Sequence, residues 1–509
     1  MPNEAQITVP IRPLIKSQYI SSDAQDNLTY AQNNCAASRT GKYPASSPGT
    51  APAQHFHTRP TVRANSVMIP RMSANSDLLD RSLSAVWHPC TQMKRHETLP
   101  LVPVARGEGV WLYDLDGQRY LDAVSSWWVN LFGHCNPRIN AAVADQLGKL
   151  EHVMLAGFTH EPVVLLSERL RELAPAGLGH CFYGSDGASA TEIALKMSAH
   201  YWRNSGKPAK TQFISLQNSY HGETLGALSV TDVALFRDAY GALIRQNATV
   251  PSPDWRNAQA GESAEACALR CAAALEAHLQ KQHEHIAAFI VEPLIQGAAG
   301  MAMYHPVYLS KARELCNHFN VHLIADEIAV GMGRTGSMFA CQQANIRPDL
   351  LLLSKGITGG YLPLSVVMTT DDIYRAFYAD ETARGFLHSH SYTGNPLACR
   401  AALATLDIFA ENDVLSANRD KAAYLNRIVQ PLREHAKVRH FRNTGMVWAF
   451  EVDTPHADFA QRCFSLGLQH GLLLRPMGNT VYFMPPYVIG KDEMQWLVTH
   501  TLKVIDHLT

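Results

Sequence analysis

Asp349-Leu350-Leu351-Leu352-Leu353-Ser354-Lys355-Gly356 decides the fold, because this stretch places one lysine directly after a short, wholly apolar run. A run of this length, bounded by polar residues and glycine, is typical of a strand buried on both faces of a sheet. At the end of such a strand the Lys355 ammonium is partly desolvated, which favours the neutral amine that can attack an aldehyde. A single lysine at a strand end is usually just an exposed residue, so the interpretation depends on its neighbours.

Around this stretch, short apolar segments alternate with segments of helical periodicity. The expected strands are 180–183, 212–216, 287–291, 321–325 and 350–353, and the expected helices are 139–150, 162–173 and 190–204. This alternation predicts an α/β fold with a mostly parallel sheet covered by helices on both faces. Residues 109–122 alternate apolar and polar side chains around Asp116-Gly117, which predicts a hairpin. After about residue 412 the pattern changes to that of a smaller α+β domain, with expected helices at 421–435 and 458–470 and strands at 447–452 and 480–484.

The length of 509 residues is too great for one core and predicts a large domain with a smaller companion. Residues 1–78 are rich in Ser, Ala, Asn, Pro and Thr without apolar periodicity, so we expect a disordered or targeting extension, or a natural start at Met68 or Met72. We expect residues 79–135 to join the small domain, 136–410 to form the large cofactor-binding domain, and 411–509 to form the small domain.

Composition excludes several classes of protein. The formal charge is −1 and no basic stripe is present, so neither nucleic acid nor an anionic membrane is an expected partner. No apolar run is long enough to span a bilayer. The ten cysteines lack paired zinc-ligand spacing, so we expect reduced thiols and no metal. We therefore expect a cytoplasmic enzyme, or an organellar one if residues 1–78 are a transit peptide.

Two features supply what a strand-end lysine needs to hold a pyridoxal cofactor, which requires a Schiff-base lysine, an anion near its ring nitrogen and a phosphate site. Asp326 follows the expected strand 321–325 and would lie at the ligand-binding edge of the sheet. Residues 184–189 read GSDGAS before a helix, where small residues such as Gly187 expose N–H groups to a phosphate. By itself this loop is equally an ordinary helix cap.

Two further strand ends could contribute to the same cleft. Tyr220, in the sequence Tyr-His-Gly-Glu-Thr, offers an aromatic face for a pyridine ring, although it could simply pack beneath its own loop. Glu292-Pro293 could add a carboxylate, or could merely begin a helix. Residues 331–336 read GMGRTG and match the dinucleotide pattern, but that match is weak because no clear helix opens on its last glycine and Lys355 replaces the expected acid.

From about Trp87 to the C-terminus, the chain resembles the class-III aminotransferases of pyridoxal-phosphate fold type I. The run from Leu323-Ile324-Ala325-Asp326-Glu327-Ile328 through residues 331–336 to Lys355 resembles the signature of that class. Other stretches resemble the members of the class that act in biotin synthesis, where they convert 8-amino-7-oxononanoate to 7,8-diaminononanoate with S-adenosylmethionine as amine donor. Those stretches are Trp87-His88-Pro89, Ser125-Ser126-Trp127-Trp128, 220–224, 303–306, 394–399, Arg475-Pro476 and 482–487.

The resemblance implies a pyridoxal 5′-phosphate cofactor held as a Schiff base on Lys355 and cycling through pyridoxamine phosphate. It implies that Asp326 pairs with the ring nitrogen and that Tyr220 stacks on the ring, which together with Lys355 form the catalytic set. It also implies that Gly187 and Ala188 hold the phosphate.

The resemblance further implies a homodimer with shared active sites, in which Ser391 reaches the phosphate of the partner subunit. Arg475 is expected to bind the keto acid's carboxylate, for which a guanidinium fork is suited. The full set expected at the substrate is Trp127, Tyr220, Arg334, Lys355, Ser389, Arg475 and Tyr482. Cys90 stands where the class often has tyrosine, and His390-Ser391 stands where relatives often have Pro-Thr.

Three alternatives stay open at this point. Another class-III ω-aminotransferase would use a different donor, such as lysine or ornithine. A pyridoxal-phosphate aminomutase or decarboxylase would use the same cofactor site without net transfer to the keto acid. A binding protein without catalysis would develop no yellow cofactor band.

Overall fold

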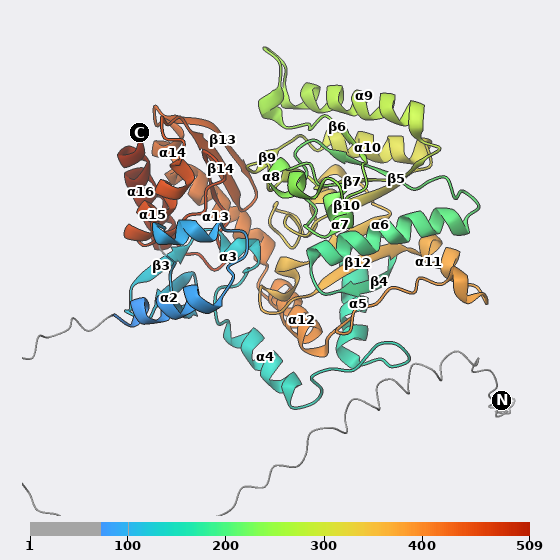
Figure 1. Ribbon diagram of the computed structural model, residues 1–509, viewed down its shortest axis with the longest axis horizontal. Helices are drawn as coiled ribbons and strands as arrows, with labels where there is room; N and C mark the ends of the chain where they lie inside the picture. The colour runs from blue at the N-terminus through green and yellow to red at the C-terminus, as the bar shows by residue number, and fades with distance from the viewer. Residues whose placement is uncertain (1–72, 100) are drawn as a thin grey trace, which may run out of the picture. The chain divides into compact units, whose positions relative to one another are not determined.

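A seven-stranded sheet forms the centre of the computed structural model, which describes residues 73–99 and 101–509 (Figure 1). Its strand order is β4-β12-β11-β10-β7-β5-β6. The strands are β4 (Leu178–Gly184), β5 (Gln212–Leu216), β6 (Ala248–Val250), β7 (Ile286–Val291), β10 (His322–Asp326), β11 (Leu350–Leu353) and β12 (Ser365–Thr370). Only β12 runs antiparallel to its neighbours β4 and β11, whereas the pairs from β11 to β6 are parallel. The predicted α/β fold with a mostly parallel sheet is therefore confirmed.

Both faces of this sheet are buried, which explains the unbroken leucine run in β11. Leu350 and Leu352 belong to one apolar core, together with side chains of α6 (Gly187–Asn204). Leu351 and Leu353 point to a second core on the opposite face. Successive side chains of a strand alternate between faces, so a strand that is covered twice must be apolar at every position.

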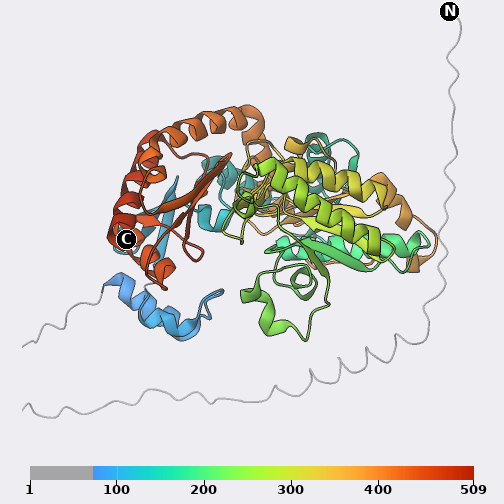
Figure 2. The same cartoon turned by 90° about the horizontal axis from the view of Figure 1, so that it is seen from above.

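Helices from several parts of the chain cover the second face of the sheet. They include α5 (Glu161–Leu173), α9 (Ala264–Gln282), α10 (Val307–His318) and α12 (Pro396–Glu411), with α4 (Pro137–Leu147) packed on α12. Short helices α7 (Leu225–Leu228), α8 (Ala234–Arg237) and α11 (Asp371–Phe377) and the small ribbon of β8 (Ile295–Gln296) and β9 (Ala302–Met303) complete this part. Figure 2 shows the helices in layers on either side of the sheet.

A second group of elements is built from segments near both ends of the described chain. The hairpin predicted around Asp116-Gly117 is present as β2 (Trp111–Asp114) and β3 (Arg119–Asp122), flanked by β1 (Val104–Glu108). Strand β3 pairs in parallel with β15 (Leu472–Leu473), which lies 350 residues further along the chain. Beside it lie an antiparallel sheet of β13 (Val438–Thr444), β14 (Val447–Val452) and β16 (Thr480–Phe483), and helices α13 (Val414–Ile428), α14 (Gln430–Arg433), α15 (Phe459–Gln469) and α16 (Lys491–Leu508).

Two boundaries differ from those expected. Helix α2 (Ala74–Ala85) begins at the N-cap Ser73, so residues 74–78 are helical rather than part of the predicted extension. The helix expected at 421–435 instead spans α13 and α14, and it is interrupted after Ile428 because Pro431 cannot continue an α-helix. The rest of the predicted extension, and the alternative starts at Met68 and Met72, lie outside the described residues. Within those residues, no helix combines the length and apolarity needed to cross a membrane.

Candidate active site

Lys355 and Asp326 lie side by side at the carboxyl edge of the seven-stranded sheet. In the parallel pair β10 and β11, Asp326 is the register partner of Leu352, and Lys355 follows three residues later. The Lys355 backbone is left-handed, with φ of 48°, and its Nζ lies 4.5 Å from the centre of the Trp128 ring. Burial lowers the pKa of Lys355 to about 8, against the opposing effect of the Asp326 and Glu292 charges. The site therefore gives Lys355 a much larger neutral fraction near physiological pH than an exposed lysine has.

Asp326 is held in place by two hydrogen bonds although it is almost fully buried. His221 Nδ1 lies 2.7 Å from Asp326 Oδ2, and the N–H of Ile328 donates to Oδ1 at 3.1 Å. His221 is itself only 2% exposed. A buried carboxylate with charge-assisted hydrogen bonds keeps a fixed orientation, so it can pair with a positively charged ring nitrogen.

Glu292 and Tyr220 form the side of the cleft next to Asp326. Glu292 accepts hydrogen bonds from the backbone N–H groups of Tyr220 at 3.0 Å and of Gly297 at 2.9 Å. Burial raises the pKa of Glu292 to about 7, the Asp326 charge adds to the increase, and His221 opposes it. The Tyr220 hydroxyl donates to Glu223 at 2.9 Å, and burial, followed by Glu223, raises its pKa. These contacts anchor the backbone and hydroxyl of Tyr220.

The first turn of α6 presents backbone donors to the same region. Its N-cap is Asp186, whose carboxylate accepts from Ser189 N–H at 2.8 Å, whereas the N–H groups of Gly187 and Ala188 have no acceptor in the part of the chain that is described. A Cβ at position 187 would lie 3.0 Å from Ile328, so the backbone here is closely surrounded. Free N–H groups at the positive end of an 18-residue helix are suited to bind a phosphate.

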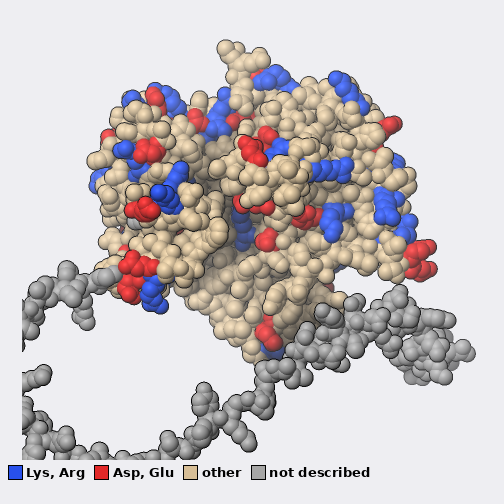
Figure 3. Space-filling model, viewed as in Figure 1, with Lys and Arg blue, Asp and Glu red and all other residues tan. Residues whose placement is uncertain are grey.

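A tryptophan pair and an arginine lie across the cleft. The guanidinium carbon of Arg475 lies 4.2 Å from the centre of the Trp127 ring. Trp128 Nε1 donates to the Tyr482 hydroxyl at 3.1 Å, and burial raises the pKa of Tyr482 to about 12. No carboxylate in the described chain forms an ion pair with Arg475. Figure 3 shows the surface hollowed between the C-terminal elements and the sheet-bearing part, with basic and acidic side chains inside.

The tryptophans are positioned by an unusual turn at α3 (Ser125–Trp128), where four consecutive residues have positive φ. Left-handed backbone costs about 1–2 kcal/mol per residue, so specific contacts must hold it. Asp122 accepts from Ser126 N at 2.9 Å and from Ser126 Oγ at 2.7 Å. Ser125 Oγ donates to the Met484 carbonyl at 2.7 Å. The turn is therefore fixed from both the N-terminal and C-terminal segments.

Arg334, predicted at the substrate, has a different setting. It is 1% exposed, and its guanidinium donates to the carbonyls of Pro485 at 2.7 Å and Asn130 at 2.9 Å. Its Cζ also lies 4.8 Å from the Tyr487 ring centre. These contacts join the segment after β10 to the two flanking segments, so they give Arg334 a structural task, and its contact with substrate stays a prediction.

Ser389 and Ser391 are both exposed, in the segment before α12. Between them, His390 Nδ1 lies 3.4 Å from Ser185 Oγ, next to the start of α6. This places the segment close to the first turn of α6 in its own chain. The contacts predicted for both serines, including the one across a dimer, stay predictions.

Two residues near the cofactor lysine were missed by the sequence interpretation, namely His221 beneath Asp326 and Trp128 beside Lys355. Both lie within motifs that were recognised for a neighbouring residue. His221 follows Tyr220, and Trp128 follows Trp127. A histidine directly after a strand-end tyrosine was a usable signal, because a buried acid requires a donor.

Comparison with known proteins identifies the class. The model of the class-III aminotransferase family matches residues 92–505, so the chain belongs to that family, as predicted. Adenosylmethionine-8-amino-7-oxononanoate aminotransferase of Helicobacter pylori is 46% identical over 445 residues, covering 86% of this chain and 99% of that protein.

Solved structures agree with this assignment. Adenosylmethionine-8-amino-7-oxononanoate aminotransferase from Methanocaldococcus jannaschii has a TM-score of 0.80 and 34% identity, covering 85% of this chain and 99% of that one. The omega transaminase from Pseudomonas jessenii in complex with PMP has a TM-score of 0.81 and 29% identity, covering 84% of this chain and 98% of that one.

Proposed function

We propose that this chain transfers an amino group from S-adenosylmethionine to 8-amino-7-oxononanoate, giving 7,8-diaminononanoate, with pyridoxal 5′-phosphate bound at Lys355. The observation that carries the proposal is the placement of Lys355 and Asp326 at the carboxyl ends of the adjacent parallel strands β11 and β10. The names of the relatives supply the substrates, since both the Helicobacter pylori and the Methanocaldococcus jannaschii proteins are named for this transfer.

The residues present fit the three parts of this cofactor that need a partner, namely its aldehyde, its ring nitrogen and its phosphate. Lys355 is a buried amine with a lowered pKa, Asp326 is a buried carboxylate with fixed orientation, and Gly187 and Ala188 offer N–H groups that have no acceptor among the described residues. Bound pyridoxal phosphate would supply an aldehyde that takes up amines and a ring that withdraws electrons from the substrate carbon. Tyr220 is positioned to stack on that ring.

The chain's own groups divide the chemistry between them. Lys355, whose pKa burial lowers to about 8, accepts a proton from the substrate carbon at its Nζ when its amine is neutral and returns it on the cofactor side. Asp326 keeps a proton on the ring nitrogen, and the His221 hydrogen bond keeps the carboxylate in position. The Trp128 ring beside Lys355 excludes water from one side of the amine.

Substrate selection rests on the opposite wall. Arg475 lies on Trp127 without a carboxylate partner in the described chain, so its guanidinium is free to bind the carboxylate of the keto acid. The Tyr482 hydroxyl accepts a hydrogen bond from Trp128, the chain neighbour of Trp127, so Tyr482 lies near the same end of the cleft. An apolar ring beneath a guanidinium fork suits a substrate with a hydrocarbon chain and a terminal carboxylate.

The proposed enzyme is a cytoplasmic homodimer. Ser391 reaches the phosphate of the partner subunit, and Ser389 lies at the substrate in the same segment. The exposure of both serines, beside the start of α6, supports a role across subunits. Size-exclusion chromatography with light scattering tests the dimer.

A donor panel tests the reaction. The cofactor-loaded protein is incubated with 8-amino-7-oxononanoate and either S-adenosylmethionine, lysine or ornithine, and product is measured by mass. Formation of 7,8-diaminononanoate with S-adenosylmethionine alone supports the proposal. Product only with lysine or ornithine indicates another ω-aminotransferase, and absence of any net transfer indicates an aminomutase or decarboxylase.

The lysine assignment has its own experiment. Borohydride reduction is expected to fix the cofactor on the peptide that contains Lys355, and Lys355→Ala is expected to abolish both labelling and transfer. Lys311→Ala is the matched control, because Lys311 is an exposed lysine paired with Glu314 on α10. Labelling of a different peptide would refute the assignment.

A further inference from the structure

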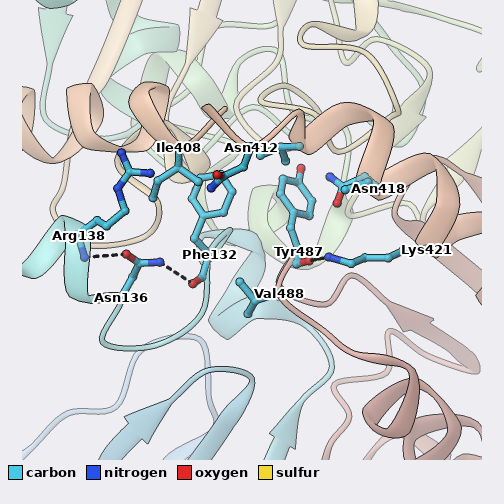
Figure 4. A pocket seen from close by; sticks show the side chains of 11 residues that line it. Phe132, Asn136, Arg138, Ile408, Asn412, Asn418, Lys421, Tyr487 and Val488 are labelled. Atoms are coloured by element: carbon cyan, nitrogen blue, oxygen red, sulfur yellow. Dashed lines mark hydrogen bonds between the residues drawn. The ribbon is translucent and has the colours of Figure 1, made fainter. Parts of the chain in front are cut away.

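A cavity of about 200 Å³ lies where three distant segments of the chain meet (Figure 4). Phe132 comes from the segment after α3, Asn418 and Lys421 come from α13, and Tyr487 and Val488 follow β16. None of the residues proposed to hold cofactor or substrate lines this junction pocket. It is smaller than the pockets of drug-sized ligands, so only a small molecule would fit.

The side-chain amide of Asn418 lines the junction pocket and is buried without hydrogen-bond partners in the described part of the chain. The residue is 2% exposed, and neither Nδ2 nor Oδ1 has a hydrogen-bond partner within the described part of the chain. Figure 4 shows its amide turned toward Tyr487. Buried side-chain amides are nearly always paired, so this one points to an occupant that supplies the missing partners.

Lys421 adds a positive charge on the same side. It lies one turn beyond Asn418 on α13, and residues three apart share a helix face. Its ammonium donates to the Tyr487 carbonyl, and among the described residues no carboxylate forms an ion pair with it. Arg138, at the mouth, is already paired with Glu411 at 2.8 Å. The uncompensated charge in the junction pocket is therefore positive.

Apolar side chains form much of the remaining wall, beside the polar side chains of Asn136 and Asn412. Phe132 is 5% exposed, Ile408 4%, Val414 6% and Tyr487 2%, and each lines the cavity. The Tyr487 hydroxyl is already used, because it donates to the Met332 carbonyl at 2.8 Å. The junction pocket thus has a polar, cationic end at Asn418 and Lys421 and a largely hydrophobic body, in which the Asn136 amide is already hydrogen-bonded to Phe132 O and Arg138 N.

We propose that the junction pocket binds a small monocarboxylate with an apolar chain. Its carboxylate accepts hydrogen bonds from Asn418 Nδ2 and Lys421 Nζ, and its chain packs against Phe132 and Val414. The remaining acceptor, Asn418 Oδ1, takes a hydrogen bond from water or from a donor on the ligand. Because the ligand contacts three segments that come together only in the folded chain, it also stabilises their junction.

Hexanoate is a suitable probe, and the cofactor-loaded Arg475→Ala protein is the reference because it removes the proposed carboxylate site in the active cleft. Titration calorimetry is expected to show one hexanoate site in this protein, and saturating hexanoate is expected to raise its melting temperature. Adding Asn418→Leu, which keeps the shape but removes both polar atoms, should weaken binding about tenfold or more, the loss expected for a hydrogen bond to a charged group. Hexan-1-ol, which lacks the charge, should bind more weakly than hexanoate.

A second variant keeps the test valid if Asn418→Leu fails to fold. Lys421→Met retains the aliphatic stem but removes the charge, and it should reduce hexanoate binding while leaving hexan-1-ol binding unchanged. Circular dichroism establishes that each variant is folded. No hexanoate binding to the Arg475→Ala protein, or binding that neither variant weakens, would overturn the proposal and leave ordered water as the occupant of the junction pocket.

Discussion

Removal of the His221 side chain tests how the site keeps its buried acid in place. His221 Nδ1 lies 2.7 Å from Asp326, and the only other hydrogen bond to that carboxylate in the described chain comes from Ile328 N–H at 3.1 Å. A hydrogen bond to a charged group contributes about 1.5–3 kcal/mol. We therefore expect His221→Leu to lower kcat/KM by about tenfold to a hundredfold, since each 1.4 kcal/mol is about a factor of ten.

The conservative variant separates positioning from folding. In His221→Asn an amide nitrogen can replace Nδ1 as donor to Asp326, so we expect kcat/KM to recover to within about fivefold of the parent, at about 1 kcal/mol or less of residual loss. Transfer is measured by product mass, cofactor binding by its visible absorbance, and folding by melting temperature. A folded His221→Leu protein with unchanged kcat/KM, or an Asn variant as poor as the Leu variant, would refute the reasoning.

Three further predictions address other parts of the site. Because the neutral amine attacks the aldehyde and the pKa of Lys355 is about 8, cofactor uptake by the cofactor-free protein should accelerate as pH rises through 8 and then level off, and an inflection near 10 in stopped-flow absorbance would contradict this. Arg475→Ala should raise KM for 8-amino-7-oxononanoate about tenfold or more in steady-state assays, whereas Arg119→Ala, which removes a guanidinium 4.3 Å from the Trp111 ring, should not. Arg334→Met should leave two buried carbonyls unpaired and lower the free energy of unfolding by about 2–5 kcal/mol, as measured by denaturant titration.

Strands buried on both faces were the easiest elements to predict from sequence. The observed bounds of β5 and β11 equal those expected, because β11 is apolar at every position and β5 is buried at every position after Gln212, as a doubly covered sheet requires. Strand β12, Ser365–Thr370, was not predicted, although it lies between β4 and β11. Its position depends on antiparallel pairing with strands far away in sequence, and no local pattern encodes that choice.

Within the site, the placement of residues at strand ends was more predictable than the hydrogen-bond partners of their side chains. Asp326 ends β10 and Lys355 follows β11, and the carboxyl ends of parallel strands meet at one edge. The contact between His221 and Asp326 joins residues 105 positions apart, so it depends on the order of β5, β7 and β10 in the sheet. The hydrogen-bond partners of the Arg334 guanidinium could not be predicted from the sequence either, because they depend on how three separate segments pack together.

Segments near the two ends of the described chain position side chains beside Lys355, which lies on the central sheet. Trp128, from the segment after β3, lies beside Lys355 and donates to Tyr482 on β16. Strands β3 and β15 pair directly, and Arg475 follows β15 by two residues. The same β-pairing therefore fixes Trp127 against Arg475 and Trp128 against Lys355. A change that loosens this pairing should weaken carboxylate binding and lysine reactivity together, although it lies outside the sheet that carries Lys355 and Asp326.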